Sequence, residues 1–142
     1  MHILPIIYSQ RDRAVVKDIV DYFDKNLIST SLIDVGNQTS FLGEILQLSS
    51  LPNPSPVQAW IASSDFMQLE FNGRDEIIAG RNALGLAPPN FSKNPRLLIL
   101  TDCESIKEWR VDGLLITSSR EIGLGLFDTD LLTKIFGFQK RP

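Results

Sequence analysis

The chain has 142 residues, enough for one domain with a single sizeable hydrophobic core. Its 43% apolar and 22% charged residues are ordinary for a globular protein, and its net charge of −3 gives no indication of a nucleic-acid or anionic-membrane partner. One cysteine and one histidine exclude an internal disulfide framework and argue against zinc or multi-histidine metal sites. Because no apolar run approaches the roughly 20 residues of a membrane span, we expect a soluble, cytoplasmic protein.

The amino-terminal quarter predicts a strand, a helix and a second strand. Residues 3–8 form a short, continuous apolar run that is typical of a buried strand. Residues 13–26 predict an amphipathic helix, with Ser9 or Asp12 as its N-cap. The apolar stripe of this helix consists of Val15, Val16, Ile19, Val20 and Phe23. Residues 27–35 are rich in β-branched and apolar residues and predict the second strand.

The middle of the chain predicts two helices on either side of a third strand. A short helix begins at Thr39 or Ser40, after a glycine-containing break. The proline-rich segment 51–56 predicts a rigid linker, because each proline fixes its own φ and restrains the preceding residue. Residues 57–62 predict the third strand, and residues 75–84 predict a helix.

The last third predicts two more strands and two helical segments. Residues 96–101 form the most apolar strand, and a short helix or turn at 104–110 separates it from a fifth strand at 111–117. A final helix carries an apolar stripe made of Phe127, Leu131, Leu132, Ile135 and Phe136. The polar tail, residues 139–142, is expected to fray.

The alternation of continuous apolar strands with amphipathic helices is typical of a parallel sheet covered on both faces. With right-handed crossovers it predicts a doubly wound, flavodoxin-like α/β domain of five parallel strands, spanning residues 1–142. Such folds bind ligands beyond the carboxyl ends of the strands, at the point where the strand order reverses. The segments expected at that edge are residues 8–12, 34–38, 63–76, 102–104 and 118–121.

Two common kinds of phosphate site are not indicated. No GxGxxG or GxxxxGK[ST] motif follows the first strand, which argues against a Rossmann or P-loop nucleotide site. A receiver domain would need an acidic pair after the first strand and a lysine after the fifth. The chain has Tyr8-Ser9 and Ser118-Ser119-Arg120 at these places, so Asp65 after the third strand does not make a phosphoacceptor site.

A third pattern consists of short motifs at the ends of successive strands. They are Tyr8-Ser9-x-x-Asp12-Arg13, Asp34 before a glycine-containing loop, Ser63-Ser64-Asp65-Phe66, and Asp75-Glu76-Ile77 on a helix. In this order they resemble the TIR (Toll/interleukin-1 receptor) domain family, and the resemblance covers roughly the whole chain in element order. Gly73-Arg74 stands where the family usually has Trp-Cys.

The resemblance implies an enzyme that cleaves the nicotinamide–ribose bond of NAD⁺ in signalling or immune defence, with Glu76 as its catalytic carboxylate and no metal or cofactor. One carboxylate is chemically sufficient, because nicotinamide is already a cationic leaving group and the transition state is oxocarbenium-like. Arg11 or Arg13 could meet the pyrophosphate, and Tyr8 or Phe66 could stack on a base. The expected substrate-binding residues are Tyr8, Ser9, Arg11, Asp12, Asp34, Asn37, Ser64 and Phe66.

The same residues have structural interpretations. Asp75 and Glu76 lie in a first helical turn, where acids complement the macrodipole, and Asp12 suits an N-cap. Asp34 suits a turn. The resemblance also allows a catalytically silent adaptor or a nucleotide-sensing module. Such a module would act through homotypic assembly or with a sensor or adaptor protein as its partner.

Overall fold

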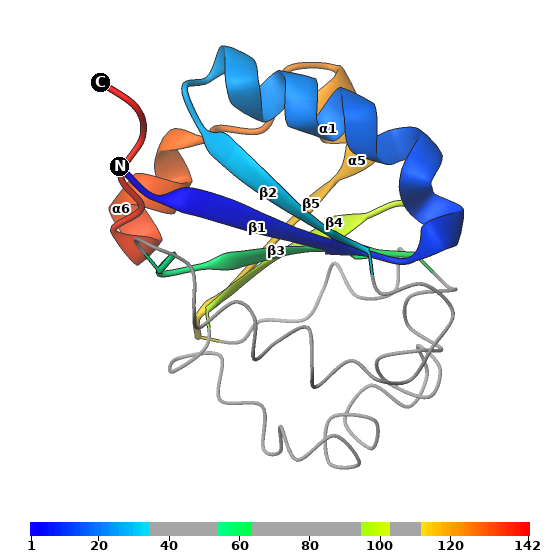
Figure 1. The fold of residues 1–142 in the computed structure, drawn as a ribbon, viewed down its shortest axis with the longest axis horizontal. Helices are drawn as coiled ribbons and strands as arrows, with labels where there is room; N and C mark the ends of the chain where they lie inside the picture. The colour runs from blue at the N-terminus through cyan, green and yellow to red at the C-terminus, as the bar shows by residue number, and fades with distance from the viewer. Residues whose placement is uncertain (35–53, 64–94, 103–111) are drawn as a thin grey trace.

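The computed structural model describes residues 1–34, 54–63, 95–102 and 112–142, which contain five strands. The strands pair as one all-parallel sheet in the order β2-β1-β3-β4-β5 (Figure 1). This confirms the prediction of an α/β fold with five parallel strands. The strands are β1 (Ile3–Tyr8), β2 (Ser29–Asp34), β3 (Gln58–Ala62), β4 (Arg96–Leu100) and β5 (Leu114–Ser118).

The central strands are buried on both faces, which explains why they read as continuous apolar runs. Successive side chains of a strand point to opposite faces, and the neighbours Trp60 and Ile61 of β3 are both 0% exposed. Every residue of β4 is buried, including Arg96, whose guanidinium lies over the Trp60 ring. Strand β2 at the sheet edge is less buried, and its Leu32 is exposed.

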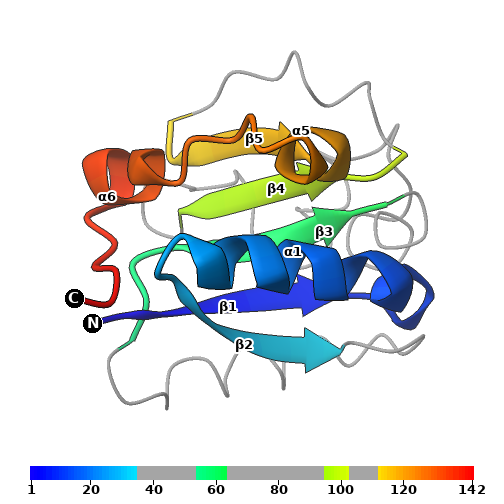
Figure 2. The same cartoon turned by 90° about the horizontal axis from the view of Figure 1, so that it is seen from above.

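Two of the helices lie side by side on one face of the sheet (Figure 2). Helix α1 (Arg13–Lys25) follows a single 3₁₀ turn, η1 (Gln10–Asp12), and buries Val16, Ile19 and Phe23 against the sheet. Helix α5 (Ser119–Gly123) begins directly after β5. The third helix, α6 (Asp130–Phe136), lies at the amino-terminal end of the sheet.

The sequence did not predict α5, and it placed the final helix too early. Phe127 is buried but precedes α6, and Ile135 on α6 is exposed. The apolar stripe inferred from these residues therefore mixes helical and non-helical positions. The helices predicted to begin at Thr39 or Ser40 and to span 75–84 and 104–110 lie outside the described residues.

Two strand starts differ from the prediction because turns precede them. Leu27 adopts a positive φ of 64° and ends α1 in a Schellman motif, in which the amide of Ile28 donates to the carbonyl of Phe23. β2 therefore begins at Ser29 rather than at residue 27. Similarly, Gly113 has a φ of 81°, and β5 begins only at Leu114.

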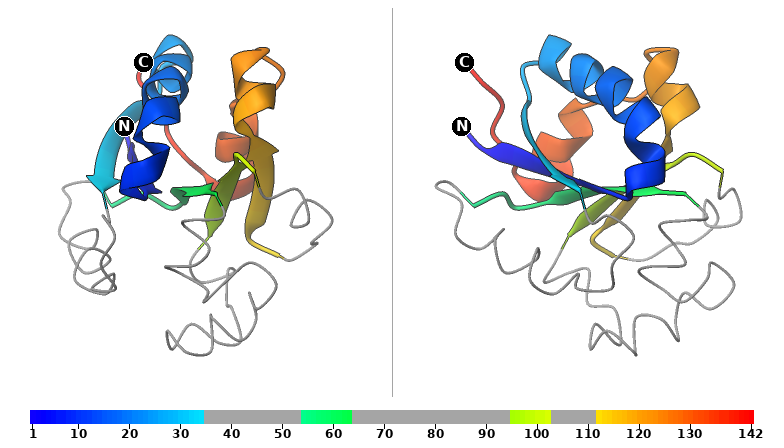
Figure 3. Two further views of the ribbon diagram at one scale, coloured as in Figure 1. Left: turned by 90° about the vertical axis from the view of Figure 1, so that its right-hand side faces the viewer. Right: turned by 45° about the vertical axis from the view of Figure 1, so that its right-hand side comes forward.

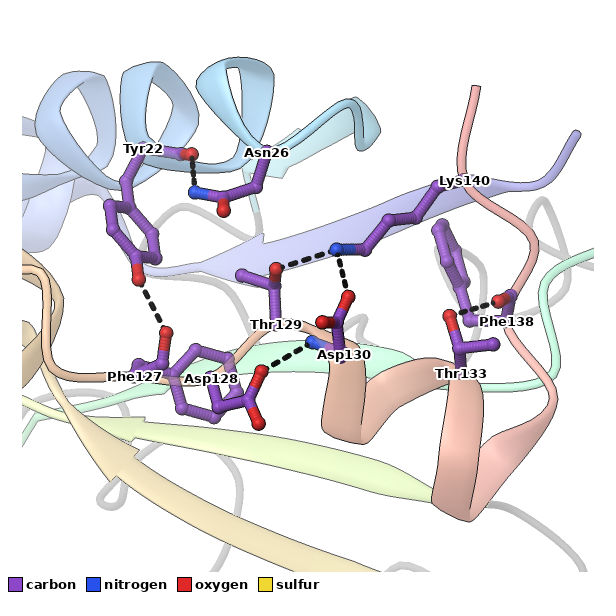
Figure 4. A network of polar contacts seen from close by, with 9 residues as sticks. All are labelled: Tyr22, Asn26, Phe127, Asp128, Thr129, Asp130, Thr133, Phe138 and Lys140. Carbon is purple, nitrogen blue, oxygen red and sulfur yellow. Dashed lines mark hydrogen bonds and ion pairs between the residues drawn. The ribbon is translucent and has the colours of Figure 1, made fainter. Parts of the chain in front are cut away.

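The prediction of a frayed tail is wrong, because residues 139–141 are bound to three separate parts of the chain. The amide of Arg141 donates to the carbonyl of Leu27 at 2.8 Å, and its guanidinium pairs with Asp24 at 2.9 Å. Gln139 exchanges backbone and side-chain hydrogen bonds with His2. Lys140 pairs with Asp130 at 2.7 Å and lowers the pKa of that carboxyl group (Figure 4).

Candidate functional site at the β1–β3 edge

The strand order reverses between β1 and β3. From β1 the chain crosses to β2 on one side, and its next strand, β3, pairs with β1 on the other side. The carboxyl ends of the three strands point to the same edge (Figures 2 and 3). At that edge Ser9 follows β1, Asp34 ends β2 and Ser63 follows β3. This is the place where open α/β sheets bind ligands.

Asp12 joins the ends of β1 and β3. Its Oδ2 accepts a hydrogen bond from Ser9 Oγ at 3.0 Å and a second one from Ser63 Oγ. Both serines are buried, with exposures of 0% and 4%. A carboxylate that accepts from buried hydroxyls satisfies groups that would otherwise be costly to remove from water. We call Ser9, Asp12 and Ser63 the switch-point cluster.

The N-cap prediction for Asp12 is right in position, but the carboxylate serves a different purpose. Asp12 is the N-cap residue of α1, yet its side chain makes no capping hydrogen bond to the helix. In the 3₁₀ turn before the helix, the backbone N–H of Asp12 donates to the carbonyl of Ser9 at 3.0 Å. The side chain of Asp12 is thereby available to the two serines.

A second polar contact connects β2 with α1. Arg13 Nη2 donates to Asp34 Oδ2 at 2.7 Å. This hydrogen bond and the charge of Asp34 raise the pKa of Arg13, with a smaller contribution from Tyr8. Tyr8 is the sheet partner of Asp34 and is only 7% exposed, whereas the Arg13 side chain is 64% exposed. A solvent-accessible guanidinium therefore lies beside the switch-point cluster.

Of the expected substrate-binding residues, the structure brings four to this edge: Tyr8, Ser9, Asp12 and Asp34. Arg11 lies exposed on η1, between Ser9 and Asp12, and Arg13 pairs with Asp34. Asn37, Ser64, Phe66 and the expected catalytic Glu76 lie outside the described residues.

The set of expected residues did not include Arg13 and Ser63. A signal for Ser63 was present in the sequence, since it occupies the position directly after the last residue of its strand, as Ser9 does after β1. Both serines therefore lie at the same edge of the sheet. No comparable positional signal distinguished Arg13 from Arg11.

The polar residues at the carboxyl end of β5, at the far end of this edge, have a structural explanation. Ser118 Oγ accepts from the backbone amide of Glu121 at 3.1 Å and caps α5. Thr117 Oγ1 donates to Glu121 Oε2 at 2.9 Å. The Thr117 side chain is buried. These polar groups satisfy the start of a helix, so among the described residues we place the candidate site at the ends of β1, β2 and β3.

Among the described residues, no group of three or more His, Cys, Asp and Glu side chains could hold a metal ion, and no helix is long and apolar enough to cross a membrane. No protein-family model matches the chain, and a comparison with curated proteins finds no match.

Proposed function

We propose that the chain is a TIR-like domain with flavodoxin-like topology, which binds NAD⁺ at the β1–β3 edge and cleaves its nicotinamide–ribose bond. The observation that supports this proposal is the convergence of the switch-point cluster and Arg13 at the reversal of the strand order. The strand order agrees with the 2-1-3-4-5 order of flavodoxin-like folds.

The chemical groups at this edge suit the two halves of a dinucleotide. Carboxylate and hydroxyl oxygens of the switch-point cluster can exchange hydrogen bonds with ribose hydroxyls. The guanidinium of Arg13 matches the geometry of a phosphate group. Tyr8 presents a flat ring at the end of β1, although its low exposure limits any stacking to the rim of the ring.

In this proposal Glu76 stabilises the positive charge that develops on the ribose as the bond to nicotinamide breaks. The bonding electron pair leaves with nicotinamide, which departs as a neutral molecule. Water then adds to the ribose carbon and releases one proton. The assignment of Glu76 rests on the motif resemblance, whereas the binding half of the proposal rests on the described edge.

The test is nicotinamide release from NAD⁺ by concentrated, assembled protein. We expect Glu76→Ala to abolish release. Glu70→Ala, which removes an acid six residues earlier in the same segment, should leave release unchanged. Loss of activity in both variants, or in neither, would contradict the assigned role of Glu76. An absence of release from the unaltered protein under every assembly condition would contradict the enzymatic function.

One observation favours a second candidate, a catalytically silent adaptor or nucleotide-sensing module. The polar groups at the edge already satisfy one another: Asp12 accepts from two serines and Arg13 is paired with Asp34. Such a site is stable without turnover and can act through ligand binding or assembly alone. Calorimetric binding of NAD⁺ without nicotinamide release would identify this module.

A further inference from the structure

We propose that Asp34 acts as a built-in competitor for anions at Arg13 and thereby determines which phosphate ligands the β1–β3 edge accepts. The proposal deepens the proposed function, on which it rests for the nature of the ligand. It predicts that Asp34 disfavours bare phosphates and tolerates a diphosphate that also carries ribose hydroxyls.

The geometry of the ion pair leaves Arg13 accessible to a ligand. Within the described part of the chain, the hydrogen bond to Asp34 uses one guanidinium nitrogen, Nη2, at 2.7 Å. A guanidinium carries five N–H donors in a planar fork, so a phosphate can approach its other edge. The Arg13 side chain is 64% exposed and that of Asp34 is 29% exposed, so both groups can be reached from solvent.

The energetics of such a pair permit displacement. An ion pair whose arginine is exposed and whose aspartate is partly exposed contributes little to stability, because water screens the attraction and both side chains lose freedom. A phosphate group offers several acceptor oxygens and can bind a guanidinium with two parallel hydrogen bonds. A ligand phosphate can therefore displace Asp34 at small cost to the fold.

The displaced carboxylate remains next to the bound anion, and this gives the selectivity. Inorganic pyrophosphate carries a high negative charge and has no ribose hydroxyl, so Asp34 repels it. A ribose hydroxyl offers a donor, and a carboxylate accepts from it favourably. Asp34 thus lowers the affinity for pyrophosphate more than it lowers the affinity for NAD⁺.

The test compares four variants with the unaltered protein by calorimetric titration with inorganic pyrophosphate and with NAD⁺ at low ionic strength. In Asp34→Asn, pyrophosphate should bind about 5- to 10-fold more tightly, since one like charge has been removed from the site. The double variant Asp34→Asn/Arg13→Gln should lose this gain. Asp34→Ser provides a second way to remove the charge if the amide perturbs the strand, and thermal unfolding checks that each variant folds.

The matched control is Asp24→Asn. Asp24 is also an aspartate paired with an arginine, Arg141, at 2.9 Å, but it lies at the other end of α1. This variant changes the net charge by the same amount as Asp34→Asn. Because Asp24 lies away from Arg13, the pyrophosphate affinity of this variant should equal that of the unaltered protein. If Asp24→Asn gained as much pyrophosphate affinity as Asp34→Asn, the gain would be explained by net charge alone, and the proposal would be overturned.

Two further results would overturn the proposal. The first is equal pyrophosphate affinity in Asp34→Asn and the unaltered protein, which includes no binding by either. The second is a gain in pyrophosphate affinity that persists in the double variant, which lacks Arg13. Nicotinamide release is measured separately on the same samples. If nicotinamide is released but Asp34→Asn does not change pyrophosphate binding, the enzymatic function stands and the role of Asp34 is refuted. If pyrophosphate binding shows the Arg13-dependent gain but no nicotinamide is released, the role of Asp34 stands and the enzymatic function is refuted.

Discussion

At the scale of single residues, Asp12 is the group whose loss should affect stability most within the candidate site. Asp12→Ala removes the acceptor of two buried hydroxyls, on Ser9 and Ser63. We expect the free energy of unfolding to fall by about 1–3 kcal/mol, the cost of leaving buried polar groups unsatisfied. Urea denaturation measures this difference.

The control for Asp12 is Asp18→Ala, which removes an exposed aspartate from α1. This substitution should change the free energy of unfolding by no more than about 0.5 kcal/mol. Equal, small effects of the two substitutions would mean that the hydroxyls of Ser9 and Ser63 find other partners, and that Asp12 does not hold the two strand ends together.

The fold holds Leu27 in a left-handed backbone conformation that is unfavourable for residues other than glycine. It has a φ of 64° at the end of α1, and its side chain is 48% exposed. Leu27→Gly should raise the free energy of unfolding by up to about 1 kcal/mol, because glycine relieves the left-handed strain and little packing is lost. Leu124→Gly is the matched control, since Leu124 is also exposed but has a φ of −87°. It should destabilise the protein, and a loss of stability in both variants would contradict the strain at Leu27.

The sequence predicted the location of single residues best where their position along a strand determined that location. Ser9, Asp34 and Ser63 could be placed at the sheet edge because each lies at or directly after the end of a strand. The choice between Arg11 and Arg13 could not be made in the same way. The 3₁₀ turn before α1 has about 3.0 residues per turn instead of 3.6, so it changes the direction of each side chain that follows.

At the scale of elements, α1 is tied to the segment between α5 and α6. The hydroxyl of Tyr22 donates to the carbonyl oxygen of Phe127, as Figure 4 shows. Burial disfavours the phenolate and the charge of Asp128 repels it, so the pKa of Tyr22 is raised above its ordinary value of 10.0. The phenol must keep its proton to donate, which makes this connection sensitive to alkali.

The pH dependence of this connection follows from the direction of the shift. Because the pKa is raised in the folded state, the contribution of Tyr22 is complete below the ordinary value of 10.0 and is lost as the pH rises through the folded-state pKa. Tyr22→Phe should cost about 1 kcal/mol at neutral pH, and it should show a smaller further loss above pH 10 than the unaltered protein. Denaturation across the alkaline range measures both, and parallel pH profiles would contradict the prediction.

The helices after β5 were the least predictable elements. Helix α5 buries only Ile122, so it carries no apolar stripe that periodicity could detect. Its start depends on the Ser118 cap, and a single capping serine is a weak signal in sequence. The buried Phe127 precedes α6 and lies outside any helix. Because it is apolar, the sequence pattern includes it in the final helix, which makes the predicted helix begin too early.

At the scale of the whole molecule, the alternating pattern was sufficient to predict the parallel sheet. Strands buried on both faces must be apolar throughout, and a parallel pair needs a long crossover between its strands. The bonds of the chain ends were not predictable, because they join residues far apart in sequence. Arg141 and Asp24 are 117 residues apart, and no local pattern connects them. The termini lie close together in Figure 1, and hydrogen bonds between His2 and Gln139 join them.

The carboxyl-terminal segment provides the last prediction, a comparison of its apolar and charged anchors. Phe138 is 0% exposed and packs in the core. Phe138→Ala should lower the free energy of unfolding by about 3–5 kcal/mol, since it removes a buried ring and leaves a cavity. Arg141→Gln keeps the backbone bond to Leu27 and removes an ion pair with the 68% exposed side chain of Asp24 and a hydrogen bond to the Asp24 carbonyl, so its cost should stay at about 1–2 kcal/mol. Thermal and urea denaturation of both variants test this order. If Arg141→Gln proved the more damaging, the segment would be held by charge, and its stability would then depend strongly on salt.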